Sequence, residues 1–173
     1  MLTSEQRYIR AMMLMGLIAS VLTLGIAWYL APLFVFDPIH NLPMRGWALV
    51  WSVAIGSLPM FILIALIAFQ RFFGTSISGD HSDPRVEVNV RVLNNTHEQF
   101  TLLIVLLVLL VAGLPEARLA MAPCLAIAFI IYRALFWFGY QKSPKMRAFG
   151  FAAGFYSNIL GTIFSVALLL SIL

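Results

Sequence analysis

Three polar residues stand at the start of an apolar segment of this chain, at a spacing that could build a binding site. Arg91, Asn95 and Glu98 follow one another at intervals of four and three residues, so on a helix they share one face. An ionisable side chain in the hydrocarbon of a membrane costs about 2.5–3.5 kcal/mol, so it normally faces a bundle interior or a wet cavity. The pattern therefore predicts a polar wall on a membrane helix.

A second helix repeats this spacing with Arg133, Trp137 and Tyr140. Glu98 lies seven residues beyond Arg91, and Arg133 lies seven residues before Tyr140. Each charge therefore sits roughly 10 Å deeper than the expected end of its helix. Because both ends are expected on the same side of the membrane, we predict that Glu98 and Arg133 are partners.

The predicted polar site contains more arginines than carboxylates, and this excess indicates what kind of ligand it binds. A buried ion pair that fixes the register of two helices is the purely structural alternative. Arg91, Arg133 and Arg147 nevertheless outnumber the single deep carboxylate, Glu98. Because guanidinium groups bind carboxylates through paired hydrogen bonds, the surplus favours an anionic ligand that carries a carboxylate.

The elements that position these residues are membrane helices. Hydrophobic residues make up 62% of the chain, charged residues only 10%, and the mean hydropathy is +0.96, which excludes a water-soluble domain. Three uncharged segments are long enough to span a bilayer, and two shorter ones become so once their polar flanks are included. The predicted fold class is an all-α integral membrane helical bundle of five spans. The expected spans are residues 11–36, 46–69, 91–114, 119–140 and 148–173.

The distribution of basic residues predicts the topology. With the N-terminus in the cytosol, nine basic residues fall on the cytosolic side and two, Arg45 and Arg118, on the other, a strong positive-inside bias. The nine are Arg7, Arg10, Arg71, Arg85, Arg91, Arg133, Lys142, Lys145 and Arg147. Their positions beside the spans explain the net charge of +4 without a nucleic-acid partner. We therefore expect a protein of the cell (inner) membrane with its C-terminus on the side opposite to the cytosol.

Three short motifs resemble those of one membrane protein family. RVLNNTHE carries an R-x-x-x-N-x-x-E pattern after VEVNVR, RALFWFGY ends a helix with R-x6-Y, and RAFGF places Arg147 seven residues beyond Tyr140. Together they resemble the MAPEG proteins, the membrane-associated proteins in eicosanoid and glutathione metabolism. That family includes microsomal glutathione transferase, leukotriene C synthase and microsomal prostaglandin E synthase. The resemblance covers residues 46–173 as a four-helix transmembrane domain, and leaves residues 1–45 as an extra N-terminal transmembrane helix with its connecting loop.

The resemblance implies a homotrimer that binds glutathione, as co-substrate or cofactor, between neighbouring subunits near the cytosolic side. The residues that would hold the tripeptide are Arg91, Asn95, Glu98, Arg133 and Tyr140. Arg71, at the end of the second span, resembles the basic residue that a neighbouring subunit contributes. Arg147 would face the thiol as the catalytic residue. No metal site is expected.

The implied activity is glutathione-dependent transfer to lipophilic electrophiles, or reduction of peroxides, at a cytosol-facing pocket. A thiol of the cysteine type has a pKa near 8.5, so only a few per cent is thiolate at neutral pH. Lowering that pKa to about 6.5 requires roughly 2.7 kcal/mol, which one guanidinium at hydrogen-bonding distance in a partly dry pocket can supply. Arg147 is the expected source of this stabilisation.

Some positions depart from the patterns of the family. Asn94 stands where the prostaglandin synthase branch has Arg, Ala148 where it has Ser, and Phe151 replaces a nearby Tyr. Gln99 stands where certain members place an aromatic residue. These changes argue against a prostaglandin synthase activity and leave conjugation, peroxide reduction or a member without catalysis open. The alternative from a different class is a non-catalytic membrane protein: a small-molecule carrier, a channel subunit or a scaffold.

The last span carries a stripe of small residues on one face. They are Gly150, Gly154, Ser157, Gly161 and Ser165. Because small side chains let helices approach closely, we expect this face to pack within the bundle or between subunits.

Overall fold

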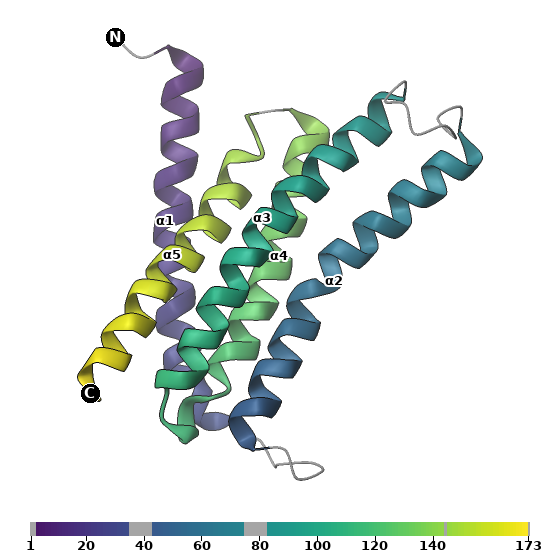
Figure 1. Ribbon diagram of the computed structural model, residues 1–173. Coiled ribbons are helices and arrows are strands. Elements are labelled where there is room, and N and C mark those ends of the chain that lie inside the picture. The colour runs from purple at the N-terminus through teal and green to yellow at the C-terminus, as the bar shows by residue number, and fades with distance from the viewer. Residues whose placement is uncertain (1–2, 35–42, 75–82, 144, 173) are drawn as a thin grey trace.

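The computed structural model describes residues 3–34, 43–74, 83–143 and 145–172, and within these ranges all regular structure is helical. Five long helices run up and down through the bundle (Figure 1). They are α1 Ser4–Leu30, α2 Met44–Phe73, α3 Pro84–Gly113, α4 Met121–Lys142 and α5 Ala148–Ser171, with the short helices η1 Ala31–Leu33 and η2 Glu116–Arg118. All five are long and apolar enough to cross a membrane, which confirms the predicted fold class of a helical integral membrane protein.

Local sequence explains where two of the helices begin. Thr3 caps α1, because its side chain accepts a hydrogen bond from the Gln6 backbone N–H at 3.2 Å while the Gln6 side chain accepts one from the Thr3 N–H at 2.9 Å. Asp83 caps α3 by accepting a hydrogen bond from the Arg85 N–H at 2.8 Å, and Pro84 occupies the first helical position.

Both α1 and α3 begin earlier than the apolar pattern predicts. α3 starts at Pro84, seven residues before Arg91, so Arg91 lies about two turns inside the helix and not at its end. An ion pair one turn apart stabilises this polar start, since the Arg91 guanidinium lies 2.5 Å from the Glu87 carboxylate. α1 likewise starts at Ser4 and carries Arg7 inside the helix. The predicted starts are wrong by about two turns because charged residues propagate a helix as readily as many apolar ones do.

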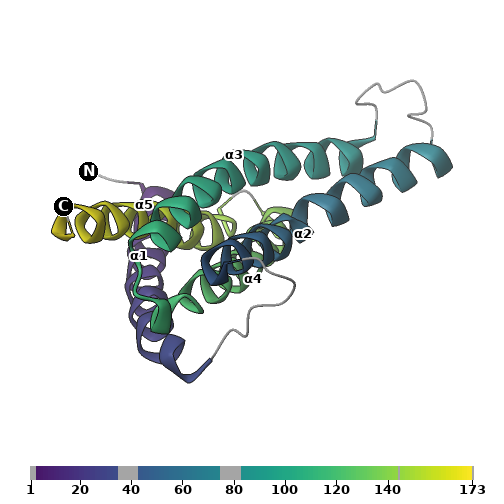
Figure 2. The same ribbon diagram turned by 60° about the horizontal axis from the view of Figure 1, so that its bottom comes forward.

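α3, α4 and α5 form the centre of the bundle, with α1 and α2 on opposite sides (Figures 1 and 2). α1 packs mainly against α5, whereas α2 packs against α3 and α4. Leu103, Leu107 and Phe129 are among the buried side chains that fill the space between the central helices. The outer faces of α1 and α2 expose large apolar residues such as Ile18 and Phe61, as expected of helices that border lipid.

The small residues of α5 lie on its buried face, as predicted. A Cβ added to Gly150 would lie 2.4 Å from the backbone nitrogen of Phe136 in α4. A Cβ on Gly161 would lie 2.8 Å from the Leu106 side chain of α3. The stripe therefore packs within the bundle and brings α5 close to both α3 and α4.

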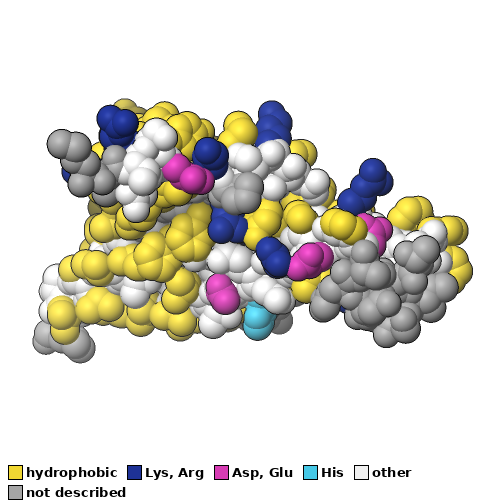
Figure 3. Space-filling view, turned by 90° about the horizontal axis from the view of Figure 1, so that it is seen from above, with side chains coloured by type: hydrophobic (Ala, Val, Ile, Leu, Met, Phe, Trp, Pro, Cys, Tyr) yellow, Lys and Arg dark blue, Asp and Glu magenta, His cyan; other side chains and the backbone are white. Residues whose placement is uncertain are grey.

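Basic residues gather at one end of the bundle, which we call the basic end. The starts of α1, α3 and α5 and the ends of α2 and α4 lie there (Figure 1). In the view onto this end, Lys and Arg side chains border exposed apolar side chains (Figure 3). Arg45 and Arg118 lie at the opposite end, where Arg45 donates to the Val111 carbonyl and Arg118 to the Trp28 carbonyl. The charge asymmetry expected from the sequence is thus present in the fold.

Candidate functional site

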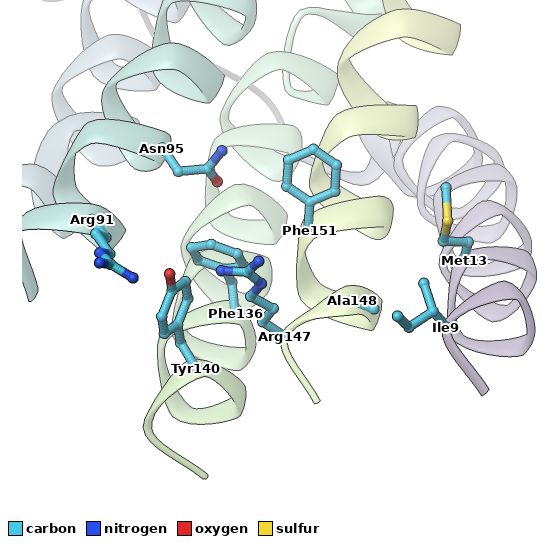
Figure 4. A pocket seen from close by; sticks show the side chains of 9 residues that line it. All are labelled: Ile9, Met13, Arg91, Asn95, Phe136, Tyr140, Arg147, Ala148 and Phe151. Carbon is cyan, nitrogen blue, oxygen red and sulfur yellow. The ribbon is translucent and has the colours of Figure 1, made fainter. Parts of the chain in front are cut away.

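A pocket of about 360 Å³ opens at the basic end, between α1 and the three central helices (Figure 4). Four of the predicted site residues line it: Arg91 and Asn95 from α3, Tyr140 from α4, and Arg147 at the start of α5. The other lining residues are Ile9, Met13, Phe136, Ala148 and Phe151. The pocket therefore joins a polar wall to an apolar one.

The turn between α4 and α5 holds Arg147 against Tyr140. The guanidinium carbon of Arg147 lies 4.4 Å from the centre of the Tyr140 ring, within the range of a cation–π interaction. Gly139 permits this turn, because a Cβ there would lie 2.6 Å from the carbonyl oxygen of Met146. Arg147 is half-buried, and in the described part of the chain it forms no ion pair with a carboxylate. Its charge is therefore available to an anion in the pocket.

Arg91 faces Tyr140 from the other side. Its guanidinium and the Tyr140 hydroxyl point toward each other in Figure 4. The Arg91 side chain pairs with Glu87 on the same helix and remains 60% exposed, so a ligand can reach it. Tyr140 therefore stands between two guanidinium groups, one against its ring and one beside its hydroxyl.

Arg133 lies beneath the pocket. The residue is only 2% exposed, and its guanidinium donates to Asn95 Oδ1 at 2.9 Å and to the Gly150 carbonyl at 3.1 Å. The Phe136 ring covers the guanidinium, with its centre 4.7 Å from the guanidinium carbon. Gly154 leaves the space for it, since a Cβ there would lie 3.1 Å from an Arg133 nitrogen. Arg133 thus links α3, α4 and α5 and holds the Asn95 side chain in place.

The predicted partnership of Glu98 with Arg133 is wrong as a direct contact. Asn95 lies between them, donating to the Glu98 carboxylate at 3.2 Å while it accepts the hydrogen bond from Arg133. No ion pair joins the two charges among the described residues. The reason is rotation around α3: three residues of helix turn the Glu98 side chain roughly 60° away from Asn95, toward the outside of the bundle.

Glu98 and Arg71 do not line the pocket. Glu98 is exposed on the outer face of α3, beside the exposed side chains of Asn94 and His97. Arg71 lies in the last turn of α2, and its Nε is buried without a hydrogen-bond partner in the residues that the structure describes. The fold brings four of the seven predicted residues into the pocket and places Arg133 directly beneath them.

Two buried polar clusters were not predicted from the sequence. Asn89 is 1% exposed, and its side chain accepts a hydrogen bond from Trp137 Nε1 at 2.8 Å and donates one to Gln70 Oε1 at 2.9 Å. Deeper in the bundle, the Asn158 side chain donates to the backbone and side-chain oxygens of Gln99 at 3.0 and 3.3 Å. An amide side chain within a membrane span could have indicated both clusters from the sequence, because a buried amide requires hydrogen-bond partners.

No residue of the first helix is among the predicted site residues, yet α1 forms part of the apolar wall of the pocket. Ile9 and Met13 line the pocket from α1. No sequence signal marks them, because they are apolar residues in an apolar span. Their position became visible only once α1 was seen to pack beside α5.

The pocket can bind an anionic ligand at its polar wall, next to an apolar molecule at its other wall. Arg91 and Arg147 offer positive charge, while Tyr140 and Asn95 offer uncharged hydrogen-bonding groups. Guanidinium groups in a partly dry site bind carboxylates strongly and can also stabilise a thiolate. In the described ranges, no group of three or more His, Cys, Asp and Glu residues could hold a metal ion.

A comparison of the chain with models of known protein families finds one match. A family model described as the MAPEG family matches residues 48–167. The matched segment contains α3 and α4 and most of α2 and α5, and it leaves α1 outside. No curated protein and no solved structure matches the chain.

Proposed function

The chain belongs to the MAPEG family, and on that premise we propose that it is a membrane-embedded, glutathione-dependent transferase or peroxidase that acts on lipophilic electrophiles. The observation that carries the proposal is the placement of Arg91 and Arg147 on two sides of Tyr140 in one pocket. Glutathione brings two carboxylates and a thiol, so a pocket with positive charge at two points and an apolar wall suits both it and a lipophilic partner.

The residues take distinct roles in this proposal. Arg91, Asn95 and Tyr140 hold the tripeptide directly. Arg133 acts through Asn95, because its guanidinium is buried and fixes the orientation of that amide. Arg147 faces the sulfur and stabilises the thiolate. The thiolate then forms a bond to the electrophilic carbon, the leaving group departs with the bonding electron pair, and the thiol proton passes to water.

Neighbouring copies complete the site as we propose it. Asn94, His97 and Glu98 are exposed on α3 although this helix is a membrane span, and polar side chains at such positions require a covering partner. We infer that the cover is another copy of the chain in a homotrimer, in which Glu98 contacts glutathione and Arg71 reaches the site from a neighbour. The positive-inside bias favours a cytosolic basic end in the cell (inner) membrane, with the C-terminus on the other side.

Calorimetric titration of the detergent-purified chain with glutathione tests the proposal. Wild type should bind saturably, and Arg91→Ala should weaken binding by about 10- to 150-fold, the value of a hydrogen bond to a charged group. Arg85→Ala is the matched control, because Arg85 is exposed at the same end but does not line the pocket. No saturable binding to wild type at millimolar glutathione would refute the function.

The role of Arg147 is tested separately by the ultraviolet absorbance of bound thiolate. Arg147→Ala should retain much of the glutathione binding, because Arg91, Asn95 and Tyr140 remain, and should lose the thiolate signal, because the guanidinium assigned to the sulfur is removed. An intact thiolate signal in this variant would show that another group activates the sulfur. Glutathione binding by wild type without any thiolate or turnover would instead favour the non-catalytic alternative.

A further inference from the structure

The first helix, α1, lies outside residues 48–167 yet lines the candidate pocket. It is anchored to α5 by close contact and by a hydrogen bond. A Cβ on Gly16 would lie 2.7 Å from the Cβ of Ala152, so the two helices touch there. One turn further, the Ser20 hydroxyl donates to the Ala153 carbonyl at 2.8 Å. α1 is therefore a fixed wall of the protomer.

Between this contact and the basic end, α1 and α5 diverge (Figure 1). Ile9 points from α1 toward the start of α5 (Figure 4). A second pocket, of about 320 Å³, shares Ile9 and Met13 with the candidate site and is also lined by Leu14, Leu17 and Tyr156. The two pockets are therefore adjacent at Ile9 and Met13, and we refer to the space lined by these five residues as the α1–α5 wedge.

The wedge suits a hydrocarbon chain. Apart from Gln6 and Arg10 near the basic end, the second pocket has an apolar or aromatic lining. Between Ile9 and Leu17, α1 rises roughly 12 Å, a distance that an alkyl tail can follow. Leu14 is 53% exposed on a membrane span, so the outer side of the wedge borders lipid. The second pocket therefore lies between the lipid-facing side of α1 and the candidate site.

We propose that the α1–α5 wedge binds the hydrocarbon tail of the lipophilic electrophile and admits this substrate from the membrane to the candidate site. The proposal rests on the proposed function, because it supplies the second substrate of that site. With an α,β-unsaturated aldehyde, the glutathione sulfur bonds to the β-carbon and the electrons of the C=C bond move toward the carbonyl oxygen. The α-carbon of the resulting enolate then takes a proton from water. The aldehyde lies beside Arg147 and the tail beside Met13 and Leu14.

Chain-length preference tests this assignment in phosphatidylcholine vesicles. Transfer of one methylene out of water favours binding about 4-fold, so wild type should have a kcat/KM, expressed against the aldehyde concentration in water, at least about 10-fold higher for an α,β-unsaturated decenal than for crotonaldehyde. Met13→Trp and Leu14→Trp should reduce that ratio by about 4-fold or more, because the indole fills the wedge. Met15→Trp is the matched control, since Met15 is 51% exposed and lines neither pocket. It should keep the wild-type ratio.

Glutathione affinity in the same vesicles separates this proposal from the proposed function. Absent glutathione binding would overturn the proposed function. Normal glutathione binding and crotonaldehyde turnover, with the same chain-length ratio in the Met13→Trp and Met15→Trp variants, would overturn the wedge alone. A diazirine-tagged decanol provides a measurement that needs no turnover. It should label residues 9–17 and 148–156 in wild type and label them less in Leu14→Trp, whereas labelling confined to α2 would overturn the wedge.

Discussion

Replacement of Gly150 by alanine tests the packing on which the candidate site depends. A Cβ at this position would lie 2.4 Å from the backbone nitrogen of Phe136 and 2.8 Å from its Cα. Both are backbone atoms, so no change of side-chain rotamer relieves the contact. Ordinary van der Waals contact begins near 3.4 Å, so α5 must move away from α4 by the difference of about 1.0 Å.

The cost of this movement follows from packing energetics. Overpacking of a well-packed interior costs about 1–3 kcal/mol. A movement of 1.0 Å would also stretch the hydrogen bond from Arg133 to the Gly150 carbonyl, now 3.1 Å, beyond hydrogen-bonding distance. Arg147 lies at the start of α5 and would shift relative to Tyr140, so glutathione affinity should fall together with stability.

Gly25→Ala is the matched control. Gly25 also lies within a helix, but a Cβ there meets nothing within 4 Å. Both substitutions replace a helical glycine, which gains up to about 1 kcal/mol of helix propensity in a helix interior such as that around Gly25 and less in the first turn of α5, so a lower stability of Gly150→Ala reports mainly the packing cost. Intrinsic tryptophan fluorescence during thermal unfolding in detergent measures it. Gly150→Ala should unfold about 2–12 °C below Gly25→Ala, from roughly 2–4 °C for each kcal/mol in a chain of this size. Equal unfolding temperatures would refute the close contact between α4 and α5.

Three further substitutions probe the buried polar contacts, each followed by thermal unfolding in detergent. Asn158→Ala removes both hydrogen bonds to Gln99 and should destabilise the bundle by about 0.6–1.7 kcal/mol; an unchanged unfolding temperature would mean that water replaces the amide. Trp137→Phe removes the 2.8 Å hydrogen bond to Asn89 and should cost about 0.5–1.5 kcal/mol, and a stabilised variant would contradict the described contact. Ser20→Ala should cost less than about 1 kcal/mol, because the backbone carbonyls that accept its hydrogen bonds keep their helical partners; a larger loss would show that this hydroxyl is the main anchor of α1.

The helices of this protein and the end at which its charges gather were predictable, because a membrane limits the conformations that a spanning segment can adopt. Hydrocarbon accepts only long segments whose backbone groups are satisfied internally, so apolar runs of sufficient length predict spans directly. The helix starts were less predictable. The polar residues from Pro84 to Arg91 continue α3 through a cap and an ion pair, and neither feature affects hydropathy.

Part of the candidate site was also predictable, because helical spacing and helix direction place residues at a known end and face. Arg91, Asn95 and Tyr140 were expected together on this basis, the family resemblance added Arg147, and all four line one pocket. Spacing within one helix does not give the rotation of that helix relative to its neighbours. For this reason the expected contact between charges on α3 and α4 was wrong, and an asparagine occupies the place between them.

The sequence by itself determined the class of the protein, its five spans, the end at which its charges gather and the family motifs. Those properties depend on composition and on distances along one helix. The tertiary structure decided that Arg133 is buried beneath the pocket, that Glu98 lies outside it, and that α1 contributes its apolar wall. These facts depend on how closely two helices approach and on which faces they turn to each other. Both are set by contacts between distant segments, such as Gly150 against Phe136 and Gly16 against Ala152, which no local pattern records.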